Sequence, residues 1–455
     1  MKKKIFLIIS LVLLLLLIFL GCITKNMPNN NNVIIIVSDA LRSDMLGCYG
    51  GDVNTPNIDW LSEQGVLFER AYTTSPWTSP SSIAMFVGVY PNIYRAGFHG
   101  FFKKYEVPDS YLLLPEYLRA INYDVKKDTE NGLSSCSNTM QGFDDIKSFD
   151  ELTTLQKNNV EDITGIKNES EEYEKVYSFL SYILTVPENR PFLLHKWFLD
   201  PHGPYAPPEK YKQEIDVDIS KLSKEKEFYV KLTGNIGWSE VAKKMSSNEK
   251  NYLISLYKKE VEFIDERIGF IIKALKFKKL LNNTFIIFTS DHGELLDEKQ
   301  DGGEAWGHAE NYSEKLVNVP LIIAGPGIAK GKRIKNVVSL LDLMPTIKDL
   351  LGVKFQDSSQ GNSFGSLLSK NSIKFRTFSL LKDNVVYFIE ANKRYDALIE
   401  NEFKLVTWNE KKLSLYDLVN DPEERWSGSL GQETGIYKCG TVLVFMPQPV
   451  SVALC

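Results

Sequence analysis

The chain has 455 residues, of which 43% are hydrophobic and 12% aromatic, so its composition supports a packed core and excludes a wholly disordered protein. Lys and Arg number 53 against 58 Asp and Glu, which gives a net charge of −5. A nucleic-acid-binding protein would show a basic surface, so we expect no nucleic-acid partner. The length is sufficient for one large α/β domain and a smaller second one.

Residues 1–22 have the pattern of a targeting segment. Three lysines precede an apolar run over residues 5–20, and a Leu-Gly-Cys sequence ends at Cys22. This ending resembles the lipobox of lipoproteins, in which Cys22 would become the acylated N-terminus. An uncleaved anchor is the alternative, although the apolar run is slightly short for about 30 Å of hydrocarbon. In both cases we expect an exported protein tethered to the outer face of the cell membrane, with the polar residues 23–32 as the tether.

Two expected buried strands end in acids. Residues 33–38 are apolar up to a Ser and lead to Asp39, and residues 284–290 lead to Asp291 and His292. Such runs are typical of strands that are buried on both faces of a parallel sheet. Ligands bind beyond the carboxyl ends of these strands, so the two carboxylates and the imidazole should meet at one edge, where a divalent cation would remove the repulsion. The alternative is that each Asp caps the next helix. Two such acids beside a His favour the metal site.

Thr78 lies at an expected helix start. Pro80 suits the first helical turn, and residues 83–87 form the apolar body of the helix. A hydroxyl at a helix N-terminus faces free N–H groups and the positive end of the dipole, which is a natural anion site. An ordinary Thr N-cap is the alternative, and this stretch taken alone favours it.

Six segments resemble motifs of the sulfatase family, within the alkaline-phosphatase-like superfamily, and they appear in the family's order. They are V-I-I-I-V-S-D-A-L-R (33–42), T-P-N-I-D-W-L-S-E-Q-G-V-L-F (55–68), S-P-W-T-S-P-S-S (75–82), D-P-H-G-P-Y (200–205), T-S-D-H-G-E (289–294) and V-P-L-I-I-A-G-P-G (319–327). A later segment, L-Y-D-L-V-N-D-P-E-E (415–424), resembles the family's C-terminal signature.

The resemblance implies an α/β fold with a large, mostly parallel sheet sandwiched by helices, forming a catalytic domain over residues 33–352. Short alternating runs after this domain predict an antiparallel sheet in a smaller C-terminal α+β subdomain, residues 353–455, with a tail over 441–455 that has no assigned role. A long amphipathic helix is expected over residues 248–281, where its apolar face serves core packing. Charge-rich residues 128–174 are expected to form a loop-bearing insertion.

The chain departs from the family pattern at the nucleophile. Family sulfatases carry C-x-P-S-R or S-x-P-S-R, whose first residue is oxidised to formylglycine, whereas this chain has Thr78 and, in place of the Arg, Ser82. Thr is not converted, so we expect no formylglycine. The family's Asp-Asp pair is Asp39 followed by Ala40, so one metal ligand is missing. A Thr nucleophile with one metal is similar to lipoteichoic acid synthases and phosphoglycerol transferases, and the Asp-His pair is similar to phosphonate monoester hydrolases.

Two further histidines match family positions. His202 follows an expected buried strand over residues 192–199, and the resemblance implies that it contacts the transferred group; a His bonded within a Pro-rich turn is the alternative. His308 lies in a Gly-rich loop and matches a Gly-His motif beside the substrate. His99 and His195 fit no motif, and we expect structural roles for both.

We therefore expect a metal-dependent ester hydrolase or transferase that acts on a phosphate or sulfate ester of a small molecule, glycan or lipid. Asp39, Asp291 and His292 would hold one divalent cation. Mixed oxygen and nitrogen ligands suit Mn²⁺ or Zn²⁺ better than Ca²⁺, whereas the family resemblance implies Ca²⁺, and Mg²⁺ is also compatible. Thr78 would be the nucleophile, and a His would donate a proton to the leaving alcohol.

Two other functions remain open at this point. One is a sulfuric ester hydrolase proper, which the family resemblance favours. The other is a non-catalytic surface module on the same fold, which the missing second Asp and the Thr at the nucleophile position would suit. Because the six candidate site residues are all present, we favour the enzyme.

Overall fold

The computed structural model describes most of the chain between residues 30 and 445. The described residues are 30–90, 107–109, 111–131, 139–167, 173–187, 189–217, 245–300, 303–309, 311–355, 359–369, 385–389, 395–400, 403–408, 412–422, 424, 436–439 and 442–445. The targeting segment, most of the tether, His99 and most of the tail lie outside the described residues.

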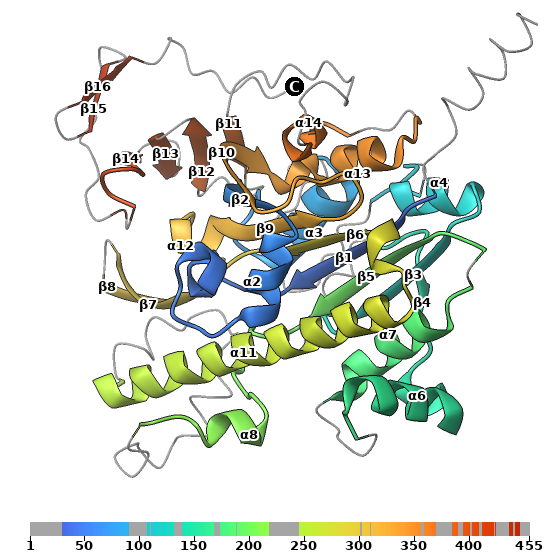
Figure 1. Ribbon diagram of the computed structural model, residues 1–455. Helices are drawn as coiled ribbons and strands as arrows, with labels where there is room; N and C mark the ends of the chain where they lie inside the picture. The colour runs from blue at the N-terminus through green and yellow to red at the C-terminus, as the bar shows by residue number, and fades with distance from the viewer. Residues whose placement is uncertain are drawn as a thin grey trace, which may run out of the picture.

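The centre of the molecule is an eight-stranded sheet with the order β10-β2-β9-β6-β1-β5-β3-β4 (Figure 1). All neighbouring strands are parallel except β9, which runs antiparallel to both β2 and β6. The strands are β1 (Asn32–Ser38), β2 (Gly65–Tyr72), β3 (Asp124–Thr129), β4 (Asp144–Asp145), β5 (Phe192–Phe198), β6 (Thr284–Ser290), β9 (Asn318–Ala324) and β10 (Lys332–Ser339).

β1 is the central strand, and all seven of its residues are buried. It is hydrogen-bonded to β5 on one side and to β6 on the other, so that Ile35 lies opposite His195 and Ile287. Alternate side chains of a strand point to opposite faces, and β-branched residues suit a strand that is covered on both faces. This explains why the apolar run of the sequence continues without polar alternation.

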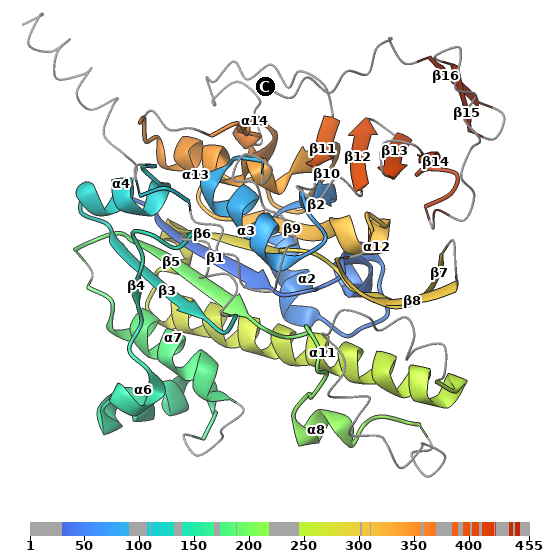
Figure 2. The same ribbon diagram turned by 180° about the vertical axis from the view of Figure 1, so that it is seen from behind.

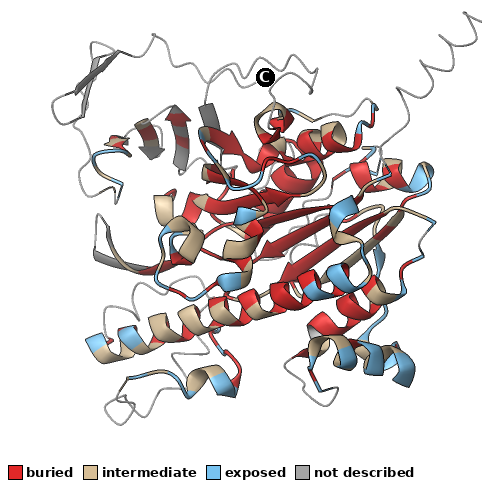
Figure 3. Ribbon diagram, viewed as in Figure 1, coloured by how far each residue is buried: buried red, intermediate tan, exposed pale blue. Residues whose placement is uncertain are grey.

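Helices cover both faces of the sheet, which gives three layers (Figures 1 and 2). The two hydrophobic cores lie between the sheet and each helical layer, and the central strands β1, β5 and β6 are buried along their whole length (Figure 3). One face carries α2 (Pro56–Glu63), α6 (Thr154–Thr164), α7 (Glu174–Thr185) and α11 (Ser247–Phe277); the other carries α3 (Thr78–Val87), α4 (Leu114–Ala120), α13 (Leu343–Leu351) and α14 (Gly365–Leu368).

α11 runs along the length of the sheet, as Figure 1 shows, and begins with a capping box between Ser246 and Glu249. Its apolar side faces the core as predicted, but the helix ends at Phe277 rather than at residue 281. The chain turns there because Lys279 takes a left-handed conformation, with φ of 56°, and a short 3-10 helix, Leu281–Asn283, follows. Within the described part of the chain, no helix is both long and apolar enough to cross a membrane.

The expected insertion over residues 128–174 contains more regular structure than predicted. Helix α6 forms within it, because the Thr153 side chain accepts the backbone N–H of Gln156 and closes a capping box. Val160 is buried against the core, although the segment is polar overall.

The C-terminal part forms a separate four-stranded antiparallel sheet in the order β11-β12-β13-β14, followed by a hairpin. These strands are β11 (Val385–Ile389), β12 (Tyr395–Glu400), β13 (Phe403–Trp408), β14 (Lys412–Asp417), β15 (Ile436–Cys439) and β16 (Val442–Phe445). The predicted fold class is therefore confirmed. Shorter elements complete the chain: α8 (Glu209–Lys212), β7 (Leu295–Gln300), β8 (Gly303–Gly307) and α12 (Glu314–Val317).

Candidate active site

The predicted site residues meet at the carboxyl edge of the central sheet. Asp39 follows β1, His202 follows β5, and Asp291 and His292 follow β6. These strands are neighbours and parallel, so their ends lie side by side. Thr78 reaches the same place because β2 ends at Tyr72 and the chain then enters α3.

Asp39, Asp291 and His292 form a compact buried group. One ligand atom from each lies within 4.8 Å of the others. His292 Nε2 is 3.7 Å from Asp39 Oδ1 and 3.4 Å from Asp291 Oδ2, and all three side chains are fully buried.

Each carboxylate of this group has one satisfied oxygen and one free oxygen. Asp39 Oδ2 accepts hydrogen bonds from the Trp197 indole N–H, at 3.1 Å, and from the Asn131 amide. Asp291 Oδ1 accepts the backbone N–H of Ala40, at 3.2 Å, and that of His292, at 2.9 Å. Asp39 Oδ1 and Asp291 Oδ2, the two oxygens that face the His292 ring, have no hydrogen-bond partner among the described residues. Buried carboxylate oxygens without donors are costly, and a divalent cation between them would satisfy both.

The protonation states of these residues also fit a cation. Burial raises the pKa of Asp291 to about 6, and burial together with the Asp291 charge raises the pKa of Asp39. Burial lowers the pKa of His292 to about 3, so its ring is neutral. Because the Gly293 carbonyl, 2.8 Å from Nδ1, can only accept, Nδ1 carries the proton and Nε2 offers a lone pair to the group.

Thr78 is the first residue of α3, and the N-cap is Trp77. The ordinary N-cap interpretation of Thr78 is therefore wrong. Its Oγ1 lies instead 3.3 Å from His292 Nε2 and is buried beside the candidate metal site of Asp39, Asp291 and His292. The helix start is held there because Ser81 Oγ donates to the Asp291 carbonyl, at 2.6 Å.

This chain has Ser82 and Ala40 at two positions where the family carries Arg and Asp. Ser82, at the position of the family's Arg, donates to the carbonyl of Thr78, at 2.8 Å, within its own helix. Ala40, at the position of the second Asp, takes a left-handed conformation with φ of 57°. Its backbone N–H binds Asp291, and its carbonyl accepts the Tyr257 hydroxyl, at 2.8 Å.

His308 and His202 stand beside the metal-ligand group. The His308 ring centroid is 4.5 Å from that of His292 and 4.9 Å from that of His202. His308 Nδ1 contacts Glu294 Oε1 at 2.9 Å, and the Glu294 side chain is fully buried. Although burial opposes charge on both groups, their attraction raises the pKa of His308 and lowers that of Glu294. His202 Nδ1 donates to the Gly203 carbonyl, at 2.7 Å, so the turn orients this ring as well.

Sequence reasoning missed three residues that complete the site: Glu294, Asn131 and Trp197. Glu294 lies in the T-S-D-H-G-E segment, so the motif contained a signal for it. Asn131 and Trp197 match no motif, and their contact with Asp39 depends on the placement of β3 and β5. His195, which was assigned a structural role, lies inside β5 among Phe86, Phe143 and Trp197.

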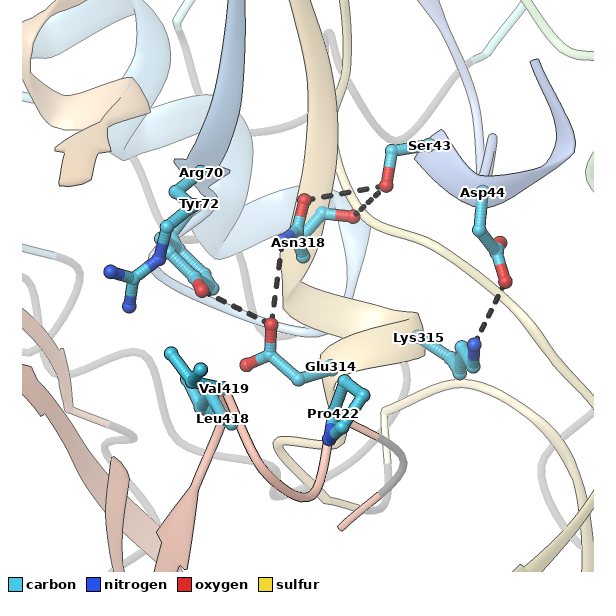
Figure 4. A pocket seen from close by; sticks show the side chains of 10 residues that line it. All are labelled: Ser43, Asp44, Arg70, Tyr72, Glu314, Lys315, Asn318, Leu418, Val419 and Pro422. Carbon is cyan, nitrogen blue, oxygen red and sulfur yellow. Dashed lines mark hydrogen bonds and ion pairs between the residues drawn. The ribbon is translucent and has the colours of Figure 1, made fainter. Parts of the chain in front are cut away.

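A separate cavity of about 260 Å³ opens where the central domain meets the C-terminal part (Figure 4). Glu314 lies at its centre and is contacted by the Tyr72 hydroxyl and the Asn318 amide. A turn of the C-terminal part covers one side with Leu418, Val419 and Pro422, as the figure shows. Its lining includes none of the six predicted site residues.

Comparison with known families identifies the central domain. The Sulfatase family model matches residues 31–353, and the model described as N-sulphoglucosamine sulphohydrolase, C-terminal, matches residues 302–432. Arylsulfatase K of Xenopus laevis is 28% identical over 433 residues, covering 86% of this chain and 77% of the relative. The arylsulfatase of Clostridium perfringens is 25% identical and covers 86% of this chain and 88% of the relative.

Solved structures share the fold. The phosphonate monoester hydrolase of Agrobacterium radiobacter is similar with a TM-score of 0.66 and 20% identity, covering 87% of this chain and 91% of that one. A protein in complex with its substrate, D-glucosamine-2-N,6-O-disulfate, is similar with a TM-score of 0.62 and 19% identity, covering 87% and 92%. Because the sulfatase model spans well over half of its residues, the chain belongs to the sulfatase family and is a hydrolase of sulfate or phosphate esters.

Proposed function

We propose that the protein is a metal-dependent hydrolase of a phosphate or sulfate ester in which unmodified Thr78 is the nucleophile. The observation that carries this proposal is the position of Thr78 Oγ1, 3.3 Å from His292 Nε2 and at the start of α3. Asp39, Asp291 and His292 fit one divalent cation, since two carboxylate oxygens without donors face an imidazole lone pair. Such a cation would lower the pKa of a coordinated hydroxyl and neutralise charge on the ester.

Each residue of the site would have a distinct role in the reaction. Thr78 Oγ1, after losing its proton to solvent, attacks the phosphorus or sulfur atom, and the bond to the leaving alcohol breaks. The alcohol takes its proton from His308, whose charged form is stabilised by Glu294. Water then attacks the covalent intermediate and gives a proton back to His308; the bond to Thr78 Oγ1 breaks, the acid leaves, and Thr78 regains its proton from solvent. The backbone N–H groups of Thr78 and Ser79, at the start of α3, would stabilise the oxygens of the transferred group. His202 is the second candidate for the proton donor.

The relatives and structural neighbours suggest which esters to test. Two relatives are named arylsulfatases, one neighbour is a phosphonate monoester hydrolase, and another was solved with a sulfated glucosamine. We therefore propose a screen of aryl sulfates, aryl phosphate mono- and diesters, and phosphonate monoesters. Sulfate turnover alone would favour a sulfuric ester hydrolase, and turnover only when an alcohol acceptor is added would favour a transferase. The absence of any turnover would favour a non-catalytic surface module.

Replacement of Thr78 tests the nucleophile. Thr78→Ala should retain the fold and the cation, because two Asp and a His remain, yet lose several orders of magnitude in turnover, or more than about 4 kcal/mol of transition-state stabilisation. Thr78→Ser should keep part of the activity. Ser79→Ala is the matched control, since it removes the neighbouring hydroxyl from the same helical turn. Mass spectrometry of protein quenched during turnover should find the transferred group on the Thr78 peptide, with Thr78 otherwise unmodified. Wild-type turnover in Thr78→Ala would place the nucleophile elsewhere.

We also propose that the protein is exported and tethered to the outer face of the membrane. The support is the apolar run before Cys22 and the Leu-Gly-Cys sequence. If Cys22 is acylated, Cys22→Ser should block processing and weaken the association with membranes, measured by fractionation and by the mass of the N-terminal peptide. If wild type and Cys22→Ser are both unprocessed and both stay in the membrane, the segment is instead an uncleaved anchor.

A further inference from the structure

Two side-chain hydrogen-bond donors hold the Asp39 carboxylate through its Oδ2 atom. Trp197, on β5, donates its indole N–H to Oδ2 at 3.1 Å, and Asn131, just beyond the end of β3, donates its amide N–H to the same oxygen. All three side chains are buried. A carboxylate oxygen has two lone-pair sites, so two N–H donors occupy Oδ2 fully. Oδ1, which has no hydrogen-bond partner, is then the single oxygen that Asp39 can offer to a cation.

The remaining ligands are restricted in the same way. Asp291 Oδ1 is occupied by the backbone N–H groups of Ala40 and His292, which leaves only Oδ2. His292 offers Nε2, and Thr78 offers its hydroxyl oxygen. The described residues at this group therefore provide four single ligand atoms, one of which is an imidazole nitrogen.

This ligand set discriminates between classes of cation. Ca²⁺ takes six to eight oxygen ligands and commonly uses bidentate carboxylates. Mn²⁺ and Zn²⁺ accept imidazole nitrogen, and Zn²⁺ is satisfied by four ligands. A carboxylate that could turn and offer both oxygens would move the site toward Ca²⁺. The N–H donors of Trp197 and Asn131 prevent this rotation of the Asp39 carboxylate.

We propose that Asn131 and Trp197 are positioning residues that hold Asp39 as a single-oxygen ligand and thereby select a small, imidazole-binding cation such as Mn²⁺ or Zn²⁺ over Ca²⁺. This inference rests on the metal site of the proposed function. It differs from that proposal because it concerns which cation is bound, and it can be tested without substrate. The donors to Asp291 Oδ1 are backbone groups, so Asp39 is the acidic ligand of the described group whose occupied oxygen can be freed by side-chain substitution.

Trp197→Phe tests the inference, because it removes the N–H donor and keeps most of the ring. Mn²⁺ and Ca²⁺ binding to metal-depleted protein would be measured by isothermal titration calorimetry, with folding checked by near-ultraviolet circular dichroism. In the wild type, Mn²⁺ should bind more tightly than Ca²⁺. In Trp197→Phe, Mn²⁺ affinity should fall about 10- to 100-fold, as for other residues that support a metal ligand, and Ca²⁺ affinity should stay constant or rise. Trp60→Phe, on α2, is the matched control and should leave both affinities unchanged.

The outcomes separate this inference from the proposed function. Asn131→Leu repeats the test at the second donor, and it carries the test alone if Trp197→Phe folds poorly. An unchanged ratio of Mn²⁺ to Ca²⁺ affinity in the folded variants, or a wild type that prefers Ca²⁺, would overturn the inference while leaving the Thr78 nucleophile intact. Conversely, a changed ratio together with wild-type turnover of Thr78→Ala would uphold the inference and overturn the nucleophile. A wild type that binds neither cation would overturn both the inference and the proposed metal dependence.

Discussion

The pKa values of His195 and His308 are shifted in opposite directions by their immediate neighbours. His195 has no carboxylate beside it, and burial among aromatic rings lowers its pKa to about 3. His308 is partly buried, 14% exposed, and the Glu294 carboxylate raises its pKa. The same side chain is therefore a neutral packing group in the first case and a candidate proton donor in the second. The difference comes from one ion pair, which a sequence pattern does not reveal.

The low pKa of His195 predicts a loss of stability at acid pH. Its pKa is 6.5 in the unfolded chain and about 3 in the folded protein, so below pH 6.5 the unfolded state binds a proton that the folded state excludes. Stability should therefore fall by up to about 1.4 kcal/mol per pH unit as the pH decreases from about 6.5 toward 3. In His195→Leu this contribution is absent, so the loss of stability between pH 7 and pH 4.5 should be smaller by about 2 to 3 kcal/mol.

Urea unfolding of both proteins at several pH values between 7 and 4.5 measures this difference. His195→Phe serves as a second variant, because a change in packing would shift the stability of each variant equally at all pH values. The contributions of other titrating groups are common to wild type and variant and cancel in the comparison. Parallel pH profiles for all three proteins would contradict the prediction.

At the scale of elements, buried strands were the most predictable features. The strand expected over residues 192–199 is observed as Phe192–Phe198, because apolar residues flank His195 and Lys196 on both sides and a short apolar run of this length is typical of a buried strand. The convergence of Asp39 and Asp291 followed from the parallel arrangement of their strands. The antiparallel direction of β9 could not be predicted, because the apolar sequence pattern of a buried strand does not depend on the direction in which the strand runs. The contact between Asn131 and Asp39 likewise depends on distant parts of the chain.

Helix α11 shows why an element assigned to packing can also organise a site. Its apolar positions fill the core, as the spacing predicted. The same buried side carries polar groups that hold the loops at the carboxyl edge: Tyr257 binds the carbonyl of Ala40, and Arg267 forms an ion pair with Asp200, two residues before His202. Buried polar groups need partners, so these contacts are specific to one arrangement of the loops. Periodicity identifies the face, and only the tertiary structure identifies the partners.

At the scale of the whole molecule, the C-terminal sheet is joined to the central domain through a buried charged cluster. Lys404, on β13, is fully buried and lies 3.2 Å from Glu314 Oε1 and 2.8 Å from Glu424 Oε1. Glu424 Oε2 also accepts the backbone N–H of Glu314, at 2.8 Å, at the start of α12. On the other side of Glu314, Oε2 accepts the hydroxyl of Tyr72, at the end of β2 (Figure 4). The cluster thus connects the second sheet to the strand that leads to Thr78.

Removal of Lys404 should therefore loosen the junction between the two sheets. Lys404→Met keeps most of the length of the side chain but leaves two largely buried carboxylates, 13% and 10% exposed, facing each other without the Lys404 charge, which typically costs about 3 to 5 kcal/mol. Thermal unfolding should show a melting temperature lower by several degrees. The double variant Lys404→Met with Glu424→Gln removes one of the opposing charges and should recover part of the loss, which a double-mutant cycle would quantify.

The matched control is the same substitution in an exposed ion pair. Lys258 Nζ lies 2.6 Å from Asp52 Oδ2 at the surface, so Lys258→Met should change stability by about 1 kcal/mol or less. If Lys404→Met costs no more than Lys258→Met, the buried cluster does not hold the two sheets together. If the double variant is less stable than Lys404→Met alone, repulsion between the carboxylates is not the cause. In the expected case, the effect of Lys404 exceeds that of Lys258 because burial removes the solvent that would otherwise stabilise the separated charges.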